Sequence, residues 1–362
     1  MDIFLILGTG SYLIFVIVII IGLFRLPSPK QSEIEFPLIS VIIAARNEEK
    51  RLPYLLKDLI RQTIPKGKME IIIVNDRSTD NTKNIITNLI PKYPFIKLVN
   101  ISESENDMPS KKHALTQAIQ ESHGEIIVST DADCRVPPSW VASMAACVKQ
   151  SKGITIGYSK VLGNNSLLHQ YQTLDFLGIM AANAGIAGAG LYWSGSGQNL
   201  AYRREDFDAI GGFERAKSQI SGDDMYLVQN IAKLNRAVVN TDPGSFVTTN
   251  PEKSITHFIN QRIRWSSNSK TAAKTGLGLF PFLLTAFLCN LSILTGLWIQ
   301  APNILLLFSL KFFLEGGVIF FGGVLFRTKV SPMTYVIWNI LQPVYIPLIG
   351  VAGLVGRFSW KP

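Results

Sequence analysis

Acidic residues recur along this chain in patterns that suit metal binding. Asp131 and Asp133 follow a short apolar run and are two residues apart, so on an extended chain both side chains leave on the same side. Proteins usually hold Mg²⁺ or Mn²⁺ with one or two carboxylates together with phosphate oxygens. The pair therefore predicts a Mg²⁺ or Mn²⁺ site for a diphosphate ligand. The structural alternative is an Asp pair that caps a turn.

Two further acidic groups suggest a nucleotide site and a base. Asp76 follows an apolar run and is predicted to accept a hydrogen bond from a nucleotide base, whereas Asp80 is predicted to cap the next helix. Asp223 and Asp224 open a helical pattern that ends near Leu234. They either favour the helix N-terminus electrostatically, or one of them is a general base that deprotonates an acceptor hydroxyl.

A basic and aromatic group precedes the last apolar region. It consists of Gln261, Arg262, Arg264 and Trp265. Guanidinium groups suit a departing pyrophosphate, and an indole ring offers a stacking face for a sugar. The competing interpretation is an interfacial tryptophan beside arginines whose charged ends reach water at a membrane edge.

The elements that must position these residues form an α/β pattern between about residues 36 and 265. Short β-branched runs predict strands at 38–44, 70–74, 95–99 and 125–129. Helical patterns follow at 48–62, 81–89 and 111–121. This alternation predicts an open, mainly parallel sheet covered by helices. Ligands of such sheets collect at the carboxyl ends of the strands, where residues 44–48, 75–80 and 130–133 fall.

Apolar stretches long enough to cross a bilayer flank this domain. Residues 3–24 predict an anchor rather than a cleaved signal peptide, because no basic segment precedes them and no small-x-small site follows. Three more stretches cover 277–299, 303–326 and 333–355. The second of these contains Lys311 and Glu315, which are four residues apart and predicted to pair or to face the protein interior.

Basic residues beside the apolar stretches predict a cytoplasmic central domain. They are Arg25, Lys30, Lys270, Lys274, Arg327 and Lys329. Arg357 and Lys361 at the C-terminus conflict with three full later spans. Pro343 and Pro347 interrupt the last stretch, so the sequence leaves open whether it is a full span or a broken or re-entrant segment.

Composition excludes several other classes. The 362 residues carry a net charge of +9, yet no basic run is interleaved with aromatic residues, so nucleic acid is not the expected partner. Anionic lipid headgroups explain the charge more simply. Three cysteines without C-x-x-C spacing and four scattered histidines predict neither a disulfide framework nor a zinc site. A nucleotidyltransferase would need a glycine-rich, basic loop for a triphosphate near the first strand, and residues 44–49 are not such a loop. A non-catalytic binding protein that kept the fold would not need Asp224.

The motifs taken in order resemble those of inverting glycosyltransferases of family 2, which have the GT-A fold. They are residues 40–48 (SVIIAARNE), 74–80 (VNDRSTD), 131–133 (DAD), 222–224 (GDD) and 261–265 (QRIRW). The resemblance covers about residues 37–265. The flanking apolar stretches are similar to those of the membrane-bound branch, which contains cellulose, chitin and hyaluronan synthases and ceramide glucosyltransferase.

The resemblance implies a role for each matching residue. The nucleoside pocket would be lined by Ala45, Glu48 and Asp76, with Lys111 near the nucleotide. Donor and metal would be held by Asp131 and Asp133, and Asp224, paired with Asp223, would be the base. The acceptor and pyrophosphate side would include Asn199, Gln261, Arg262, Arg264 and Trp265. Two positions depart from the family pattern: Asp223 replaces the commoner Glu, and Ser110 replaces Gly.

The expected architecture is a GT-A mixed sheet with helices on both faces and transmembrane helices at both ends. The predicted parts are an anchor (1–26), a cytoplasmic catalytic domain (36–265), an interfacial linker (266–276) and a membrane domain (277–356). The expected reaction moves a sugar from a UDP- or GDP-sugar to a lipid acceptor at the inner or plasma membrane. A processive polysaccharide synthase, with a glycan acceptor, is the alternative, although three later stretches are few for a polymer channel. For the Ala/Gly-rich residues 181–190, we expect either a mobile loop or tight helix packing.

Overall fold

The computed structural model describes residues 2–27, 35–65, 67–103, 108–163, 165–275 and 278–356. Lys30, Arg357 and Lys361, which entered the prediction of orientation, lie outside these residues. The chain divides into two compact units. We call Ser28–Lys160 with Ser194–Asn250 the sheet unit, and Met1–Pro27, Val161–Trp193 and Pro251–Pro362 the membrane unit.

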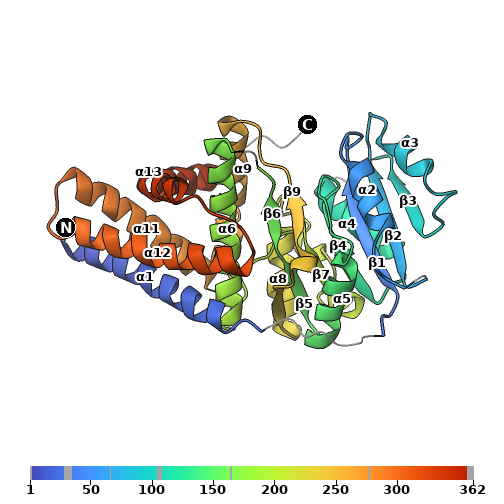
Figure 1. Cartoon of the computed structure of the whole chain (residues 1–362), viewed down its shortest axis with the longest axis horizontal. Coiled ribbons are helices and arrows are strands. Elements are labelled where there is room, and N and C mark those ends of the chain that lie inside the picture. Colours follow the sequence, from blue (N-terminus) through green and yellow to red (C-terminus); the bar gives the residue numbers. More distant parts are fainter. Residues whose placement is uncertain are drawn as a thin grey trace. The chain divides into compact units, whose positions relative to one another are not determined.

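A seven-stranded mixed sheet forms the centre of the sheet unit, with the order β3-β2-β1-β4-β7-β5-β8 (Figure 1). Its strands are β1 (Ile39–Ala45), β2 (Met69–Asp76), β3 (Ile96–Ile101), β4 (Ile126–Ser129), β5 (Ile154–Gly157), β7 (Leu200–Arg203) and β8 (Ala237–Asn240). Strands β1 to β4 run parallel, whereas β7 runs antiparallel to both β4 and β5. A separate two-stranded sheet pairs β6 (Ser159–Val161) with β9 (Val247–Thr249).

Helices cover both faces of this sheet. They are α2 (Leu52–Ile60), α3 (Thr82–Thr87), α4 (Ser110–Gln120), α5 (Trp140–Ser151), α7 (Arg204–Ala209) and α8 (Asp223–Leu234), with 3₁₀ turns at Glu214–Ala216 and Pro243–Ser245. Alternate β1 residues, among them Val41 and Ile43, share a buried core with apolar residues of α2 and α5. Helix α4 packs on β1 and β2 with residues outside that core. The predicted fold class is confirmed.

The membrane unit is helical. Its helices are α1 (Asp2–Phe24), α6 (Leu167–Gly188), α9 (Ile255–Ser266), α10 (Ser269–Thr275), α11 (Leu279–Trp298), α12 (Ile304–Leu325) and α13 (Pro332–Val355). Among the residues that the structure describes, four segments are long and apolar enough to cross a membrane: Leu5–Phe24, Leu279–Trp298, Ile304–Leu325 and Pro332–Val355. Of the alternatives left open for the last stretch, a break is wrong, because α13 continues through Pro343 and Pro347. Membrane helices tolerate proline where neighbouring groups satisfy the freed carbonyls.

Glycines allow α1 and α6 to approach each other closely. A Cβ atom at Gly22 of α1 would lie 1.7 Å from the carbonyl oxygen of Gly185, and one at Gly188 would lie 2.0 Å from that of Gly22. No residue with a side chain fits at either position, so the backbones are in direct contact. Tight helix packing, one of the two expectations for residues 181–190, is therefore what the structure contains.

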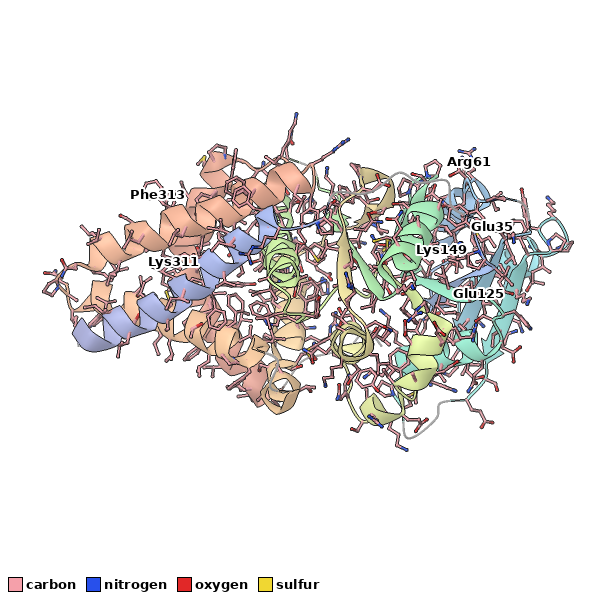
Figure 2. The ribbon with its side chains drawn as sticks, turned by 90° about the horizontal axis from the view of Figure 1, so that it is seen from below. Glu35, Arg61, Glu125, Lys149, Lys311 and Phe313 are labelled. Atoms are coloured by element: carbon pink, nitrogen blue, oxygen red, sulfur yellow. The ribbon has the colours of Figure 1, made fainter. Side chains whose placement is uncertain are left out.

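A polar cluster lies buried inside the membrane unit. Lys311 Nζ donates hydrogen bonds to Glu315 Oε2 and Gln342 Oε1, both at 2.8 Å. Glu315 also accepts from Tyr12 Oη and Asn339 Nδ2, both at 2.7 Å. Figure 2 shows Lys311 among the helices of this unit. The predicted pairing of Lys311 with Glu315 is confirmed, and the cluster around it joins α12 to α13 and to α1.

Candidate active site

The carboxyl ends of β1, β2 and β4 meet at one edge of the sheet, because these strands are neighbours and run parallel. Ala45, the last residue of β1, is in register with Asn75 of β2, and Asp76 ends that strand. Asp131 and Asp133 follow β4 directly. The residues predicted from the strand ends thus lie at one edge of the sheet.

Lys111 joins two of the predicted acidic groups. Its Nζ lies 2.8 Å from Asp131 Oδ1 and 3.8 Å from Asp223 Oδ2, so the first turn of α4 connects the end of β4 with the start of α8. Burial alone would lower the pKa of Lys111, but the Asp131 and Asp223 carboxylates outweigh it and hold that pKa well above its ordinary value. The ammonium therefore stays charged between the two carboxylates.

Asp224 has the most unusual acidity of this group. Burial, followed by the neighbouring Asp223 carboxylate, raises the pKa of Asp224 to about 6. Asp224 Oδ1 accepts a hydrogen bond from the Met225 N–H at 2.8 Å, and the Gly197 N–H provides a second one. A carboxyl group with this pKa can exchange a proton near neutral pH, which suits a general base.

Gly197 is part of this cluster although sequence reasoning did not select it as a site residue. A Cβ atom at this position would lie 3.4 Å from Asp223 Oδ2 and 3.5 Å from Lys111 Nζ. Its backbone therefore reaches the charged groups directly. The nearest residue selected from the sequence was Asn199, two positions further along the chain.

Asp133 is held by a residue that was not predicted. Arg51, just before α2, places Nη1 3.2 Å from Asp133 Oδ2. Asp131 and Asp133 thus each already accept a hydrogen bond from a cationic group. Within the described residues no three His, Cys, Asp or Glu side chains gather as metal ligands. Two carboxylates are nonetheless what Mg²⁺ or Mn²⁺ needs when phosphate oxygens complete its coordination, so the residues fit such an ion.

The loops after β1 and β2 hold each other in place. Asn47, in the left-handed region at φ 55°, accepts a hydrogen bond from the Thr79 N–H at 2.8 Å, and the Glu48 N–H donates to Thr82 Oγ1 at 2.9 Å. Asp80 accepts from the Thr82 N–H at 3.0 Å and from the Glu49 N–H at 3.0 Å, but the N-cap of α3 is Asn81, so Asp80 holds the turn before the helix instead of capping it. These contacts fix the loops that follow Ala45 and Asp76, the first of which carries Glu48.

Asp76 is linked to the start of α4 through Arg77. Arg77 Nε donates to Asp76 Oδ1 at 2.7 Å, and its Nη2 donates to Ser110 Oγ at 2.5 Å. Ser110 is the position where the resembling family has Gly. The serine hydroxyl therefore ties the turn that carries Lys111 to the end of β2.

Asn199 is a fully buried structural contact. Its Oδ1 accepts from Trp140 Nε1 at 2.9 Å, and its Nδ2 donates to the carbonyl oxygens of Tyr158 (2.9 Å) and Ser245 (2.8 Å). All hydrogen-bonding capacity of the amide nitrogen is used by the protein. Its predicted part on the acceptor side is therefore limited to positioning the segment that contains Gly197.

The 261–265 motif lies on α9 of the membrane unit. Arg262 is 6% exposed, with its Nε 2.7 Å from Asp175 Oδ2 and its guanidinium carbon 4.2 Å from the ring centre of Trp265. Gln261 Nε2 donates to Glu252 Oε1 at 2.8 Å, and Arg264 lies in the last turn of the helix. Asp175 was not predicted, although it is an acidic residue within the mainly apolar stretch of α6. Contact of the motif with a pyrophosphate stays a prediction.

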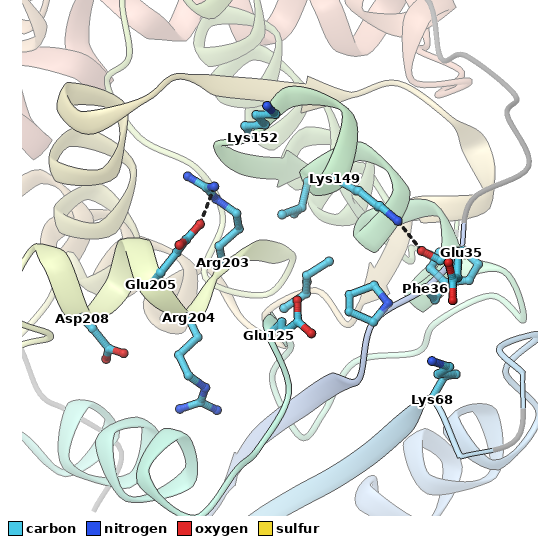
Figure 3. Close-up of a pocket in the computed structure, with 13 residues that line it drawn as sticks. Glu35, Phe36, Lys68, Glu125, Lys149, Lys152, Arg203, Arg204, Glu205 and Asp208 are labelled. Atoms are coloured by element: carbon cyan, nitrogen blue, oxygen red, sulfur yellow. Dashed lines mark hydrogen bonds and ion pairs between the residues drawn. The ribbon is translucent and has the colours of Figure 1, made fainter.

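A cavity of about 730 Å³ lies at the opposite edge of the sheet (Figure 3). Lys68 and Glu125, which line it, directly precede β2 and β4, so they mark the amino ends of these strands. Arg203 in its wall is paired with Glu205 and Asp206. The cavity is thus separate from the acidic cluster, and the candidate site is the cluster.

Comparison with known proteins agrees with this architecture. The structure is similar to the mannosyltransferase PcManGT from Pyrobaculum calidifontis, solved in complex with GDP-Man and Mn²⁺. The similarity has a TM-score of 0.68 and 17% identity, and it covers 98% of this chain and 97% of that one. The fold is therefore that of a GT-A-type enzyme, as the sequence implied.

Two family models match the sequence: glycosyl transferase family 2 over residues 40–211, and glycosyl transferase family group 2 over residues 126–355. The second spans more than half of the chain, and the protein belongs to this family.

Several curated relatives share part of the chain. The probable glycosyltransferase YdaM of Bacillus subtilis is 38% identical over 109 residues, and the beta-monoglucosyldiacylglycerol synthase of a Nostoc species is 31% identical over 143 residues. These matches cover 30% and 39% of this chain, and 26% and 30% of the length of the relatives.

Proposed function

We propose that the protein transfers a sugar from a UDP- or GDP-sugar to a membrane lipid, with inversion at the anomeric carbon. The observation that carries the proposal is the contact of Lys111 with both Asp131, after β4, and Asp223, at the start of α8. This contact places Asp131, which suits donor binding, in the same cluster as Asp224, the candidate base. Membership of the family supports the same activity.

In this reaction Asp224 is the general base. With a pKa of about 6 it is mostly ionised at neutral pH and accepts the proton of the acceptor hydroxyl as that oxygen attacks the anomeric carbon. The bond from this carbon to the diphosphate breaks on the opposite side. The nucleoside diphosphate leaves with the bonding electrons, and the configuration inverts. Asp223 assists by making Asp224 more basic.

Donor binding is assigned to the strand ends. Ala45, Glu48 and Asp76 would line the nucleoside pocket, and Asp131 and Asp133 would hold Mg²⁺ or Mn²⁺. When bound, the ion would neutralise charge on the diphosphate. Lys111 would remain beside Asp131, near the phosphates. The Mn²⁺ and GDP-Man in the PcManGT complex support this choice of ligands.

A lipid acceptor is favoured over a growing glycan. One relative is named for the synthesis of a glucosylated diacylglycerol, and four segments of this chain are long and apolar enough to cross a membrane. In the proposal the catalytic part is cytoplasmic, and the 261–265 motif serves the acceptor and pyrophosphate side, while Asn199 only positions the segment that contains Gly197. Arg262 would act there by orienting Trp265, since its own guanidinium is bound to Asp175.

The test is a transfer assay with the purified full chain. Single nucleotide sugars and Mn²⁺ are supplied with a total lipid extract, and products are identified by mass spectrometry. One new glycolipid, absent with Asp224→Asn, supports the proposal. A ladder of chain lengths would instead indicate a processive synthase, and turnover retained by Asp224→Asn would remove Asp224 as the base.

A further inference from the structure

Lys112 is a buried lysine that the proposed reaction does not use. It follows Lys111 on α4 and is 1% exposed. Its Nζ donates hydrogen bonds to the carbonyl oxygen of Ala216, at 3.1 Å, and to that of Gln219. Lysine is rarely buried to this extent unless it is paired, so this cation has a specific use inside the sheet unit.

The two carbonyl groups belong to the segment that leads into α8. After Gln219 the chain reaches Gly222, which has a left-handed φ of 86°, and then Asp223 and Asp224 as the first two residues of the helix. The direction in which Asp224 leaves the helix therefore depends on how this segment enters it. Lys112 holds the segment three residues before the glycine.

The charge of Lys112 also fits this place. Burial lowers the pKa of Lys112, while the Asp223 and Asp224 carboxylates act against that effect. A methionine would fill a similar volume but would remove both hydrogen bonds to the carbonyl oxygens of Ala216 and Gln219. The filling of space alone therefore does not explain a lysine at this position. The two carbonyl groups that it binds and the nearby carboxylates of Asp223 and Asp224 do.

We propose that Lys112 is a positioning residue for the general base. By binding the carbonyl oxygens of Ala216 and Gln219, it fixes the turn before α8 and so the placement of Asp224. The first turn of α4 then has two adjacent functions: Lys111 contacts the carboxylates, and Lys112 holds the backbone that carries them. This inference rests on the proposed function for the role of Asp224, but the anchoring of the turn does not depend on it.

The experiment compares Lys112→Met, Lys112→Arg and a control, Lys57→Met, in the full chain in detergent. Lys57 is exposed on α2, away from this turn. Hydrogen–deuterium exchange is followed in peptides that cover residues 214–222. Two hydrogen bonds from a charged group are lost in Lys112→Met, so exchange there should be at least about tenfold faster. Lys57→Met should match the wild type.

Turnover provides the second readout. Misplacement of the base should lower kcat of Lys112→Met by roughly 10²-fold while the donor KM changes little. Lys112→Arg keeps the charge and should recover protection of the turn and part of kcat.

The two readouts separate the possible failures. Unchanged exchange of residues 214–222 in Lys112→Met would overturn the anchoring. Faster exchange with unchanged kcat would overturn the positioning of Asp224. If Lys112→Met does not fold, a Lys112→Arg variant with wild-type exchange and kcat equal to that of Asp224→Asn would refute the inference. A wild-type chain that transfers no sugar contradicts the proposed function instead, and the exchange data still test the anchoring.

Discussion

Asp224→Asn should stabilise the folded protein at neutral pH. Burial and the Asp223 carboxylate raise the pKa of Asp224 from an ordinary 3.8 to about 6. The folded state therefore holds this proton more tightly than the unfolded chain, and wild-type stability falls as the pH rises from about 4 through about 6. Above this pH range, the pKa difference lowers the free energy of unfolding of the wild type by roughly 3 kcal/mol. Asparagine carries no charge, so the stability of the variant should not decrease over this pH range.

Thermal unfolding between pH 4 and pH 8, in detergent without donor or metal, measures the effect. The variant and the wild type should unfold at nearly the same temperature at pH 4. At pH 8 the variant should unfold roughly 6–12 °C higher, given the size of the sheet unit. Asp208→Asn, which alters an exposed carboxylate on α7, is the matched control and should follow the wild type. A difference that does not change with pH, or a less stable variant at pH 8, would refute the reasoning.

Three other predictions follow from the described contacts. Lys311→Met leaves the Glu315 carboxylate buried without its cation and should lower the free energy of unfolding in detergent by about 3–5 kcal/mol, while adding Glu315→Gln should restore most of it. Asp131→Ala should abolish Mn²⁺-dependent binding of the nucleotide sugar in calorimetry, and unchanged binding would exclude this residue as a ligand. Gly22→Ala should destabilise the protein by about 3 kcal/mol or more because its new methyl group meets backbone atoms; Gly10→Ala, where nothing lies within 4 Å, should have little effect in the same unfolding assay.

The parallel half of the sheet was predictable because β1, β2 and β4 are almost entirely buried and therefore rich in β-branched residues. The strand expected at 38–44 is β1 (Ile39–Ala45), and the helix expected at 111–121 is α4 (Ser110–Gln120). Strands β5, β7 and β8 were not predicted, since each has only four residues and includes polar or small ones. Their pairing with distant strands, rather than local pattern, makes them strands.

The candidate site was predictable where a residue's position along a strand decides its place. Asp131 and Asp76 are at strand ends, and their location follows from the sheet alone. The neighbours Lys111 and Lys112 look alike in the sequence, yet one contacts carboxylates and the other is buried against carbonyls. Arg262 likewise gave no sign that Asp175 of α6 would pair with it. Such contacts depend on tertiary packing, which no local pattern contains.

The contact between α1 and α6 bears on any attempt to obtain the catalytic part in water-soluble form. Helix α6 lies in the middle of the chain, between β6 and β7, and its glycines fit directly against α1. Deleting the first 27 residues would remove α1 and leave the glycine-lined face of α6 exposed. Helix α6 cannot be deleted as well, because it connects the two chain segments that form the sheet unit. Shortened versions should therefore aggregate, and biochemical work is better planned with the whole protein in detergent or nanodiscs.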